Sequence, residues 1–501
     1  MQASRGRLFM KIALINAPWE SKSFFQSIPW LPIGIVYVGT VLEQNGFQVQ
    51  VLDAAAKRWS HGQVVTWLKQ VSPDVVGLSA LTLPFLSLVD LVRAIKAWNP
   101  RVIIVLGHYF ATMEADRIIR KHGDFVDFCV RGEGENTFLA LCQWLDRHPG
   151  KEPDGIHGIT YRSTTGRVIS TPDAPLIVDL DTIPFPNRSL VDHAYKWAIG
   201  GFVLPRTRFT TMISSRGCPF KCTYCACSRF ARQRWRPRSP ENIVAELAIV
   251  AEQGYTDVNF VDDNFTLRKD RVLETCRRIK QEGIDINWHV DGRVDHAWAD
   301  MFAAMHGAGC RLIWLGFEST SQRVLDIYDK KTRVDMFDRA IRNVRRAGIE
   351  IIVGLFMVGA PTETLDEIRH TIEYAVRSDI DLPVLNILDV YSGIQLWDDA
   401  IARGWMRDDD IVDVEVGGTM RKAERWETLT KLVDVSKTPS ERAEIHRLVA
   451  EARRTLFSLR RMNALVHGAM RVLRSPYLRG IAADVVSRLP STIKTLASFR
   501  D

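Results

Sequence analysis

Short apolar runs alternate with amphipathic stretches through the first 150 residues of the chain. The runs have the length of buried strands, and the stretches between them carry their apolar residues at helical spacing. The predicted strands are Ile12–Asn16, Phe47–Leu52, Val75–Ser79, Val102–Leu106 and Phe125–Val130. The predicted helices are Val36–Gln44, Gln63–Gln70, Ser87–Trp98 and Met113–Lys121. This alternation predicts an α/β domain over residues 1–150, with a doubly wound (Rossmann-like) parallel sheet that binds ligands at the carboxyl ends of its strands.

A second alternating series starts near Thr210 and fills residues 206–400. Its predicted strands are Thr211–Ser214, Val258–Val261, Asn287–Val290, Leu312–Gly316, Ile351–Met357 and Leu385–Val390. Its predicted helices are Ile243–Gln253, Arg271–Gln281, Met336–Arg346 and Leu365–Ser378. The series predicts a partial (β/α)6 barrel, in which the residues that carry chemistry follow the carboxyl ends of the strands.

The segments outside these two series are less regular. Residues 151–205 contain polar strands and the proline-containing segment Leu180–Pro186, which suits an extended linker. Residues 401–501 are predicted to be a helical region that ends in a basic tail, Thr455–Asp501, with eight Arg and Lys residues against two Asp and a net charge of +6. Apolar residues recur at helical spacing from Leu456 to Leu473. We therefore expect the tail either to pack on the barrel or to touch an anionic membrane.

The composition is that of a globular protein. Of the 501 residues, 46% are hydrophobic and 25% are charged, and the length suggests about three domains. Eight cysteines in so long a chain do not form a disulfide scaffold, so we expect a reducing compartment, the cytoplasm. No signal peptide and no membrane span are predicted. The net charge of +7 is a modest excess, and without a recognisable helix-turn-helix or RNA-reading motif we expect no nucleic-acid partner.

The chemistry-bearing feature of the second series is a Cys-x3-Cys-x2-Cys loop after its first strand, formed by Cys218, Cys222 and Cys225. Iron–sulfur cubanes usually take four thiolates, so three ligands leave one iron open to a substrate or cofactor. Arg216 and Lys221 beside the loop would favour the thiolate forms. A structural zinc site that enlists Cys227 is the alternative interpretation, although no second pair of ligands follows at zinc-site spacing.

The spacing of the cysteines, Gly217 before the first and Tyr224 before the last resemble the signature of the radical S-adenosylmethionine (SAM) superfamily. The resemblance implies a 4Fe-4S cluster whose open iron is chelated by SAM, and whose reduction releases a 5'-deoxyadenosyl radical. It also implies SAM contacts at the strand ends, with no catalytic residue beyond the cofactors. The predicted contacts are Tyr224, Asp262, Asp263, Arg293, Glu318, Ser319 and Gly359.

Several of these residues also have a purely structural interpretation. Asp262 and Asp263 could cap a helix, and Glu318 could be an N-cap acid stabilised by the helix dipole. Arg293 could pair with a neighbouring aspartate. Their shared position at the same end of consecutive strands favours the SAM site.

The N-terminal series resembles the cobalamin-binding domain that precedes the radical SAM domain in one large subfamily. The resemblance rests on Leu31–Gly34 before the first helix and on Arg131–Glu135 after the last strand, and it spans nearly the whole domain. It implies cobalamin contacts at Pro18, Trp19, Pro32, Gly34, Ser79, Thr82, Gly107, His108, Gly132 and Glu133. The Asp-x-His-x-x-Gly loop of methionine-synthase-like domains is missing, and neither His61 nor His108 has that context. The resemblance therefore implies base-off cobalamin without a histidine ligand.

Together the resemblances imply a cobalamin-dependent radical SAM enzyme, in the family of C-methyltransferases and of relatives such as the anaerobic magnesium-protoporphyrin ester cyclase. The leading hypothesis is a methyltransferase acting on an unactivated carbon of a natural product or lipid: one SAM methylates the cobalamin and a second yields the radical. A non-methylating oxidative cyclase or hydroxylase is the nearest alternative, and a cobalamin-binding sensor with a structural metal site belongs to another class. The expected partners are a small-molecule, lipid or peptide substrate, a reductant such as flavodoxin or ferredoxin, and a membrane met peripherally by the basic tail.

Overall fold

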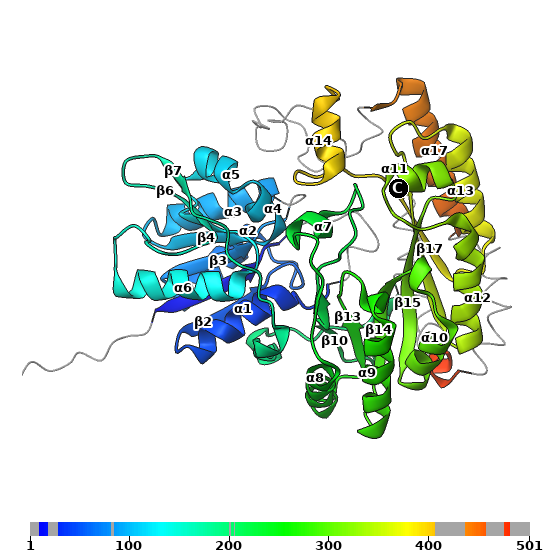
Figure 1. Cartoon of the computed structure of the whole chain (residues 1–501). Coiled ribbons are helices and arrows are strands. Elements are labelled where there is room, and N and C mark those ends of the chain that lie inside the picture. The colour runs from blue at the N-terminus through cyan, green and yellow to red at the C-terminus, as the bar shows by residue number, and fades with distance from the viewer. Residues whose placement is uncertain are drawn as a thin grey trace, which may run out of the picture. The chain divides into compact units, whose positions relative to one another are not determined.

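Parallel strands form the centre of the N-terminal part of the chain, as the apolar runs predict. The structure, a computed structural model, describes residues 10–18, 29–81, 85–199, 202–204, 206–405, 436–456 and 475–480. These residues divide into two compact units, and the division falls between Ala194 and Tyr195 (Figure 1). Two predicted cobalamin contacts, Trp19 and Thr82, lie outside the described residues, as does most of the basic tail.

The N-terminal unit contains a seven-stranded sheet of order β2-β1-β3-β4-β5-β6-β7. Its strands are β1 (Lys11–Asn16), β2 (Gln48–Asp53), β3 (Val75–Ser79), β4 (Ile103–Gly107), β5 (Phe128–Val130), β6 (Ile159–Arg162) and β7 (Val168–Ser170). The first five are parallel, which confirms the doubly wound sheet. β6 and β7 come from the segment predicted as a linker and run antiparallel. An antiparallel hairpin needs only a short turn, so it extends the sheet without a crossover helix.

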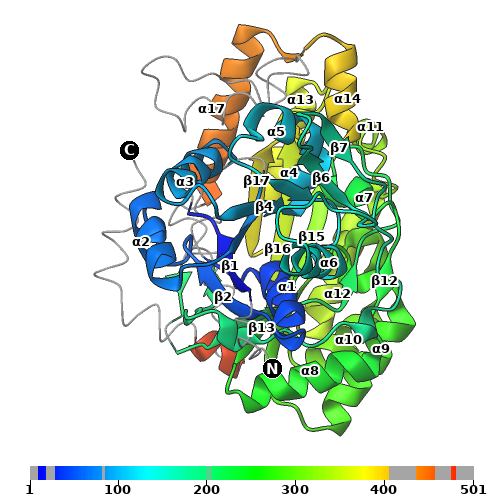
Figure 2. The same cartoon turned by 90° about the vertical axis from the view of Figure 1, so that its left-hand side faces the viewer.

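Helices cover both faces of this sheet. They are α1 (Ile33–Gln44), α2 (His61–Val71), α3 (Phe85–Trp98), α4 (His108–Met113), α5 (Ala115–His122) and α6 (Gly134–Arg147). α1 and α6 lie together on one face, and α2 and α3 lie together on the other (Figures 1 and 2). The predicted helix Met113–Lys121 corresponds to α5, and α4 is an additional short helix before it, separated from α5 by Glu114, which leaves helical geometry with φ of −116°. The strand order changes direction at β1, so the carboxyl ends of β1 and β3 form the switch point at which such sheets bind ligands.

The C-terminal unit contains six parallel strands in sequential order. They are β10 (Phe209–Met212), β13 (Asp257–Phe260), β14 (Asn287–Arg293), β15 (Cys310–Glu318), β16 (Ile351–Val358) and β17 (Leu382–Ile387). Each strand pairs with the next, which confirms the partial (β/α)6 barrel. The sixth strand starts earlier than predicted, because Leu382 pairs with Val353 of β16.

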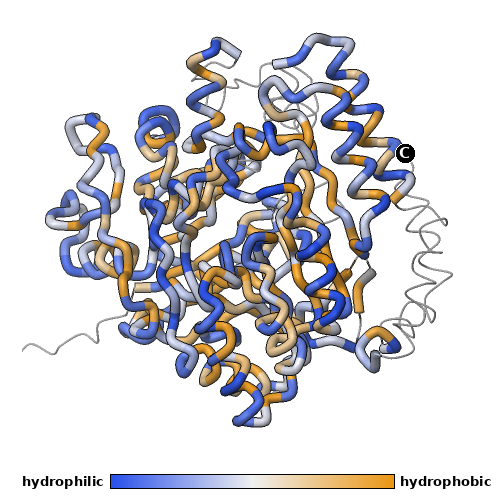
Figure 3. The backbone as a smooth tube through the Cα atoms, turned by 45° about the vertical axis from the view of Figure 1, so that its right-hand side comes forward, coloured by the Kyte–Doolittle hydropathy of each residue, from blue (hydrophilic) through white to orange (hydrophobic). Residues whose placement is uncertain are grey.

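One layer of helices packs on the outer face of this second sheet. The layer consists of α8 (Pro240–Glu252), α9 (Lys269–Gln281), α10 (Ala299–Gly307), α12 (Phe337–Ala347) and α13 (Leu365–Arg377). The sequence prediction lacks α10, whose Ala- and Met-rich sequence has little polar contrast. Alternate strand residues such as Val258, Val290 and Ile313 fill the core under the helices, and Figure 3 shows hydrophobic and hydrophilic positions alternating along the backbone. The residues between them face the opposite side, which we call the inner face.

Aromatic side chains close the amino-terminal end of the barrel. The ring of His289 packs against that of Trp197, with centroids 4.1 Å apart and planes tilted by 33°, and its Nε2 lies 3.2 Å from the hydroxyl of Tyr477. Tyr477 belongs to residues 475–480, the described part of the basic tail, where Ser475 donates a hydrogen bond of 3.0 Å to Glu350. α17 (Pro439–Leu456) packs on α13 and β17. The described C-terminal region thus packs on the barrel. None of the described helices is long and apolar enough to span a bilayer.

Candidate cofactor sites

A short hairpin and one glycine fix the start of the cysteine loop. β11 (Ser215–Arg216) pairs antiparallel with β12 (Arg236–Pro237), so the loop leaves and returns at one place. Gly217 has φ of +84°, and a Cβ added there would lie 2.1 Å from the carbonyl oxygen of Arg234. Only glycine satisfies both the left-handed backbone and the close approach, which explains the glycine before the first cysteine.

Two cations, Arg293 of β14 and Lys330 after α11 (Gln322–Ile327), act on the thiol of Cys222. The Nη1 of Arg293 lies 3.9 Å from the Sγ. Burial raises the pKa of this thiol, while the positive charges of Lys330 and Arg293 oppose the rise. The positive charges that favour the thiolate form of Cys222 include those of Arg293 on β14 and of Lys330 in the segment after β15. The contribution of the sequence neighbours Arg216 and Lys221 stays a prediction.

The other two thiols of the loop differ in their surroundings. Burial raises the pKa of Cys218 to about 11. A hydrogen bond from the thiol of Cys227 lowers the pKa of Cys225 to about 7, and Cys227 also contacts the carboxylate of Asp263. Among the described residues, no group of three or more His, Cys, Asp or Glu side chains converges on one metal-ion position. The donor set fits a cubane, in which each cysteine binds a different iron and the ligands do not meet at a point.

Asp262 and Asp263, which follow β13, hold the loop in place. Asp262 accepts hydrogen bonds from the backbone N–H of Ser214 at 2.7 Å and from the hydroxyls of Ser214 and Ser215 at 2.5 and 2.6 Å. Asp263 accepts one from the N–H of Gly217 at 2.8 Å. Because the protein itself occupies the Asp262 carboxylate, which is 2% exposed, the geometry supports a bracing role for it. A direct SAM contact of these aspartates stays a prediction.

A buried ion pair joins β15 to the tyrosine of the cysteine motif. Lys330 Nζ donates to Oε1 of Glu318 at 2.5 Å, and the hydroxyl of Tyr224 donates to the same oxygen at 3.2 Å. Glu318 has a left-handed backbone, with φ of +65°, which is uncommon for a residue with a side chain. A Cβ added to Gly316 would lie 2.5 Å from that oxygen and 2.7 Å from the Lys330 Nζ. Arg293 donates to the carbonyl of Lys330 at 2.5 Å and so connects the pair to the cysteine loop.

Arg293 makes the ion pair with a neighbouring aspartate that the structural interpretation predicted, and it also reaches the cysteine loop, while its contact with SAM stays a prediction. Its guanidinium pairs with Asp295 through two bonds of 3.0 Å. The same group reaches Cys222 and lies 3.7 Å from the ring centroid of Phe220. A fixed guanidinium at a thiolate lowers the energy of the charged form, so this residue suits a cluster site.

The last two predicted SAM residues bond within the protein. The hydroxyl of Ser319 is buried and lies 3.3 Å from that of Thr371 on α13. The N–H of Gly359, whose φ is +93°, donates to Glu363 at 2.6 Å. Burial raises the pKa of Glu363 to about 7. Ser319 follows the end of β15 and Gly359 follows the end of β16, at the same end of the barrel strands as the cysteine loop. Their contact with SAM stays a prediction.

Sequence reasoning missed Lys330 and the serines that hold Asp262. Lys330 lies in an Asp-Lys-Lys run, which is typical of a solvated turn. Its partner Glu318 is turned toward it by a register shift between Gly316 and Glu318 where β15 pairs with β16. No spacing in the sequence marks such a shift.

The described cobalamin candidates follow the carboxyl edge of the N-terminal sheet. They are Pro18 after β1, Pro32 and Gly34 at the start of α1, Ser79 at the end of β3, Gly107 and His108 at the end of β4, and Gly132 and Glu133 after β5. A Cβ added to Gly34, Gly107 or Gly132 would meet nothing within 4 Å. These glycines therefore present bare backbone to open space, which fits a flat macrocycle lying against the edge. His108 is exposed, and His61 lies 3.0 Å from Ser87.

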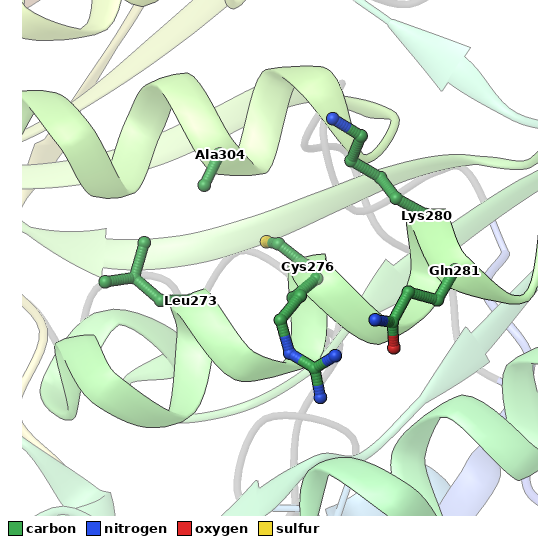
Figure 4. A pocket seen from close by; sticks show the side chains of 6 residues that line it. Leu273, Cys276, Lys280, Gln281 and Ala304 are labelled. Atoms are coloured by element: carbon green, nitrogen blue, oxygen red, sulfur yellow. The ribbon is translucent and has the colours of Figure 1, made fainter.

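A hollow on the outer surface of the C-terminal unit lies apart from these strand ends (Figure 4). It is lined by Leu273, Cys276, Arg277, Lys280, Gln281 and Ala304 of α9 and α10. Burial raises the pKa of Cys276 to about 12, so its thiol stays protonated and unreactive. We assign no cofactor to this hollow.

Comparison with known proteins identifies a family for each of the two parts of the chain. Residues 212–375 match the Radical SAM superfamily, and residues 28–142 match the B12 binding domain. A Pyrococcus horikoshii protein described as an uncharacterized methyltransferase is 33% identical over 395 residues, which cover 78% of this chain and 83% of that protein. The anaerobic magnesium-protoporphyrin IX monomethyl ester cyclase of Rubrivivax gelatinosus is 28% identical over 73% of this chain and 65% of its own.

A solved structure has the same architecture. The radical SAM methyltransferase TsrM from Kitasatospora setae, with cobalamin and a 4Fe-4S cluster bound, superposes with a TM-score of 0.65 and 20% identity over 79% of this chain and 75% of its own. At that identity the likeness concerns the fold. The chain therefore belongs to the radical SAM superfamily, among the enzymes that carry a B12-binding domain and use SAM, a 4Fe-4S cluster and cobalamin.

Proposed function

We propose that this enzyme is a methyltransferase that places a methyl group on an unactivated carbon of a natural product or lipid. The observation that carries the proposal is the three-cysteine loop, held beside the Arg293 and Glu318–Lys330 network, in one chain with a glycine-edged cobalamin-binding sheet. When bound, the cluster and SAM supply a carbon-centred radical, and the cobalamin supplies a methyl group. Two of the three relatives above are methyltransferases by name.

The residues of the chain would hold these groups and keep water away from them. Cys218, Cys222 and Cys225 would bind three irons, with the fourth facing SAM. Asp262 and Asp263 keep the loop on the strand ends. Tyr224, Arg293, Glu318, Ser319 and Gly359 are the proposed walls of the SAM site. Fixing the reacting atoms in a dry site is the protein's share of such chemistry.

Anaerobic turnover with SAM that carries a trideuterated methyl group tests the proposal. The full, reconstituted chain is incubated with a reductant and an extract of the source organism. We expect a product with a trideuterated methyl group, together with 5'-deoxyadenosine and S-adenosylhomocysteine in equal amounts. Formation of 5'-deoxyadenosine and an oxidised product without transferred deuterium would replace methyl transfer by the cyclase or hydroxylase reaction, which the Rubrivivax relative represents.

The cluster assignment has its own prediction. Replacing Cys218, Cys222 and Cys225 by Ala should remove the cluster and abolish SAM cleavage, while cobalamin still binds. Iron analysis and cobalamin absorbance on the same sample measure both. Because a cubane carries about four irons, retention of that content in the triple variant would contradict the assignment. Cys276→Ala, on the helix layer, is the control.

The partners are a small-molecule substrate and a reductant, for which flavodoxin or ferredoxin is proposed. Peripheral membrane contact through the tail stays a proposal, because Arg460, Arg461, Arg471 and Arg474 lie outside the described residues. Since residues 475–480 pack on the barrel, the test neutralises these four arginines and keeps the tail. If the variant and the wild type stay equally in the supernatant after sedimentation of anionic vesicles, at low and at high salt, the tail is only a packing element.

A further inference from the structure

The inner face of the barrel sheet becomes accessible at one layer. The inward residues His289 and Leu312 are buried, whereas the next inward residues on the same strands, Asp291 and Trp314, are partly exposed. Asp291 and Trp314 are register partners across β14 and β15, so their side chains leave the sheet side by side. Above them the strand β14 leads to Arg293 and the cysteine loop. We call the Asp291–Trp314 layer the floor.

The polar groups of this floor have no protein partner within the described residues. The indole Nε1 of Trp314 is buried without an acceptor, and no hydrogen bond reaches the carboxyl of Asp291. Asn259 of β13, the register partner of His289, is 1% exposed, and neither its Oδ1 nor its Nδ2 has a partner. Buried polar groups are nearly always paired. The two unpaired groups of the floor, with the unpaired Asn259 one layer below them, therefore point to a ligand that pairs with Asp291 and Trp314.

The charges around the floor narrow the kind of ligand. Burial and the carboxylates of Asp262 and Asp263 raise the pKa of Asp291 to about 7. These carboxyls oppose an anionic group at the floor. The accessible inward residues of β16, Leu355 and Met357, are apolar. The surface thus offers one carboxyl, one N–H donor and an apolar wall.

We propose that Asp291 and Trp314 are the floor of the substrate site and recognise a neutral group that both donates and accepts a hydrogen bond, such as a carboxamide or a peptide group. The carboxyl of Asp291 accepts the N–H of that group, and the indole of Trp314 donates to its carbonyl. A carboxylate or phosphate in this position is rejected by like charge. The inference rests on the proposed function, since the molecule on the floor is the one to be methylated.

Three probes with the same six-carbon length test the floor: hexanamide, hexanoate and hexylamine. Ligand-observed saturation-transfer NMR on the reconstituted full chain measures their binding. We expect hexanamide to bind about tenfold more tightly than hexanoate, because a site built for hydrogen bonds rejects an analogue that leaves them unpaired. Asp291→Asn removes the charge at constant shape and should reduce that ratio to about twofold. Trp314→Phe keeps an aromatic side chain but removes the indole N–H, and it should weaken the binding of hexanamide about tenfold.

Asp300→Asn on the outer surface, where the aspartate side chain is 63% exposed, is the matched control and should keep the probe order. Equal affinities for all probes, tightest binding of hexanoate or hexylamine, or no saturation transfer to any probe would each overturn the floor. Iron content reports whether each variant is folded. If only one of Asp291→Asn and Trp314→Phe folds, that variant alone tests the proposal. If the enzyme transfers methyl groups but hexanamide is not the tightest-binding probe, only the proposal for Asp291 and Trp314 is wrong. If hexanamide binds most tightly but no methyl group is transferred, only the proposed function is wrong.

Discussion

At the residue scale, the pair of Glu318 and Lys330 determines how the site responds to substitution. Both side chains are buried, at 8% and 4% exposure. Lys330→Met leaves the carboxylate charged and unpaired, so we expect the free energy of unfolding to fall by about 3–5 kcal/mol. Anaerobic urea denaturation measures it.

Two further variants separate charge from packing at this pair. The double variant Lys330→Met with Glu318→Leu leaves no buried charge and should be more stable than Lys330→Met alone. Arg333→Met breaks an exposed pair with Asp335 and should be neutral. If all three variants lost the same stability, the buried charge would not be the cause.

His289 predicts a dependence of stability on pH. Burial lowers its pKa to about 3, below its ordinary value, so the folded state favours the neutral ring. The stability that this provides is complete above pH 6.5 and is lost as the pH falls toward 3. The loss at pH 5 is about 2 kcal/mol. Burial raises the pKa of the adjacent Asp257 to about 6, which acts in the opposite direction.

Melting temperatures of wild type and His289→Gln between pH 7.5 and 5 measure this dependence, over a pH range chosen around the ordinary histidine pKa of about 6.5. The variant should lose less stability than the wild type on acidification, while His370→Gln, at an exposed position of α13, should follow the wild type. Parallel curves for His289→Gln and the wild type would mean that His289 does not titrate in this range.

The residues that the sequence identified are those whose chemistry needs a fixed spacing. Cys218, Cys222 and Cys225 follow one another in one loop, so the chain itself displays the ligand set. Lys330 reaches Glu318 through a register shift, and Asp291 meets Trp314 only across strands. Contacts that depend on register between separate strands leave no trace in a local pattern.

At the scale of elements, the β11–β12 hairpin and Gly217 decide whether the cysteine loop forms. Gly217→Ala forces a Cβ against the carbonyl of Arg234 and strains a left-handed backbone. We expect reconstituted iron and sulfide to fall several-fold, since the first ligand is displaced. Gly283→Ala is the control: its φ of +65° gives comparable strain, but nothing lies within 4 Å. Equal iron content in both would show that the close approach is unimportant.

The periodicity of the sequence predicted the central parallel strands, but it did not predict the β6–β7 hairpin or α10. Buried parallel strands such as Val75–Ser79 are continuous apolar runs, which a window of sequence shows directly. The hairpin of β6 and β7 pairs at the edge of the sheet and carries polar residues, so its segment resembled a linker. α10 packs between α9 and α12 with little polar contrast. Tertiary packing, and not local sequence preference, therefore stabilises the β6–β7 hairpin and α10.

At the scale of the whole molecule, the chain holds two cofactor-binding units, and the N-terminal one predicts the state of its cobalamin. We expect base-off cobalamin without a protein imidazole, because no Asp-x-His-x-x-Gly loop follows the first strand and His61 bonds to Ser87. Electron paramagnetic resonance of the cob(II)alamin form should show no nitrogen splitting from a protein ligand. Splitting that disappears in His61→Ala or His108→Ala, with Gln63→Ala as control, would identify a lower ligand.

The contact between Tyr477 and His289 also determines at which stage of synthesis the barrel can finish folding. A ribosome makes the chain from its first residue, so all six strands of the barrel leave it before Tyr477 does. Until then the amino-terminal end of the barrel lacks its last aromatic side chain, and His289 has no partner from the tail. The nascent barrel can therefore complete its packing only once Tyr477 has been synthesised, about 90 residues after the end of its sixth strand at Ile387, so the barrel waits in an incomplete state for a segment far along the chain.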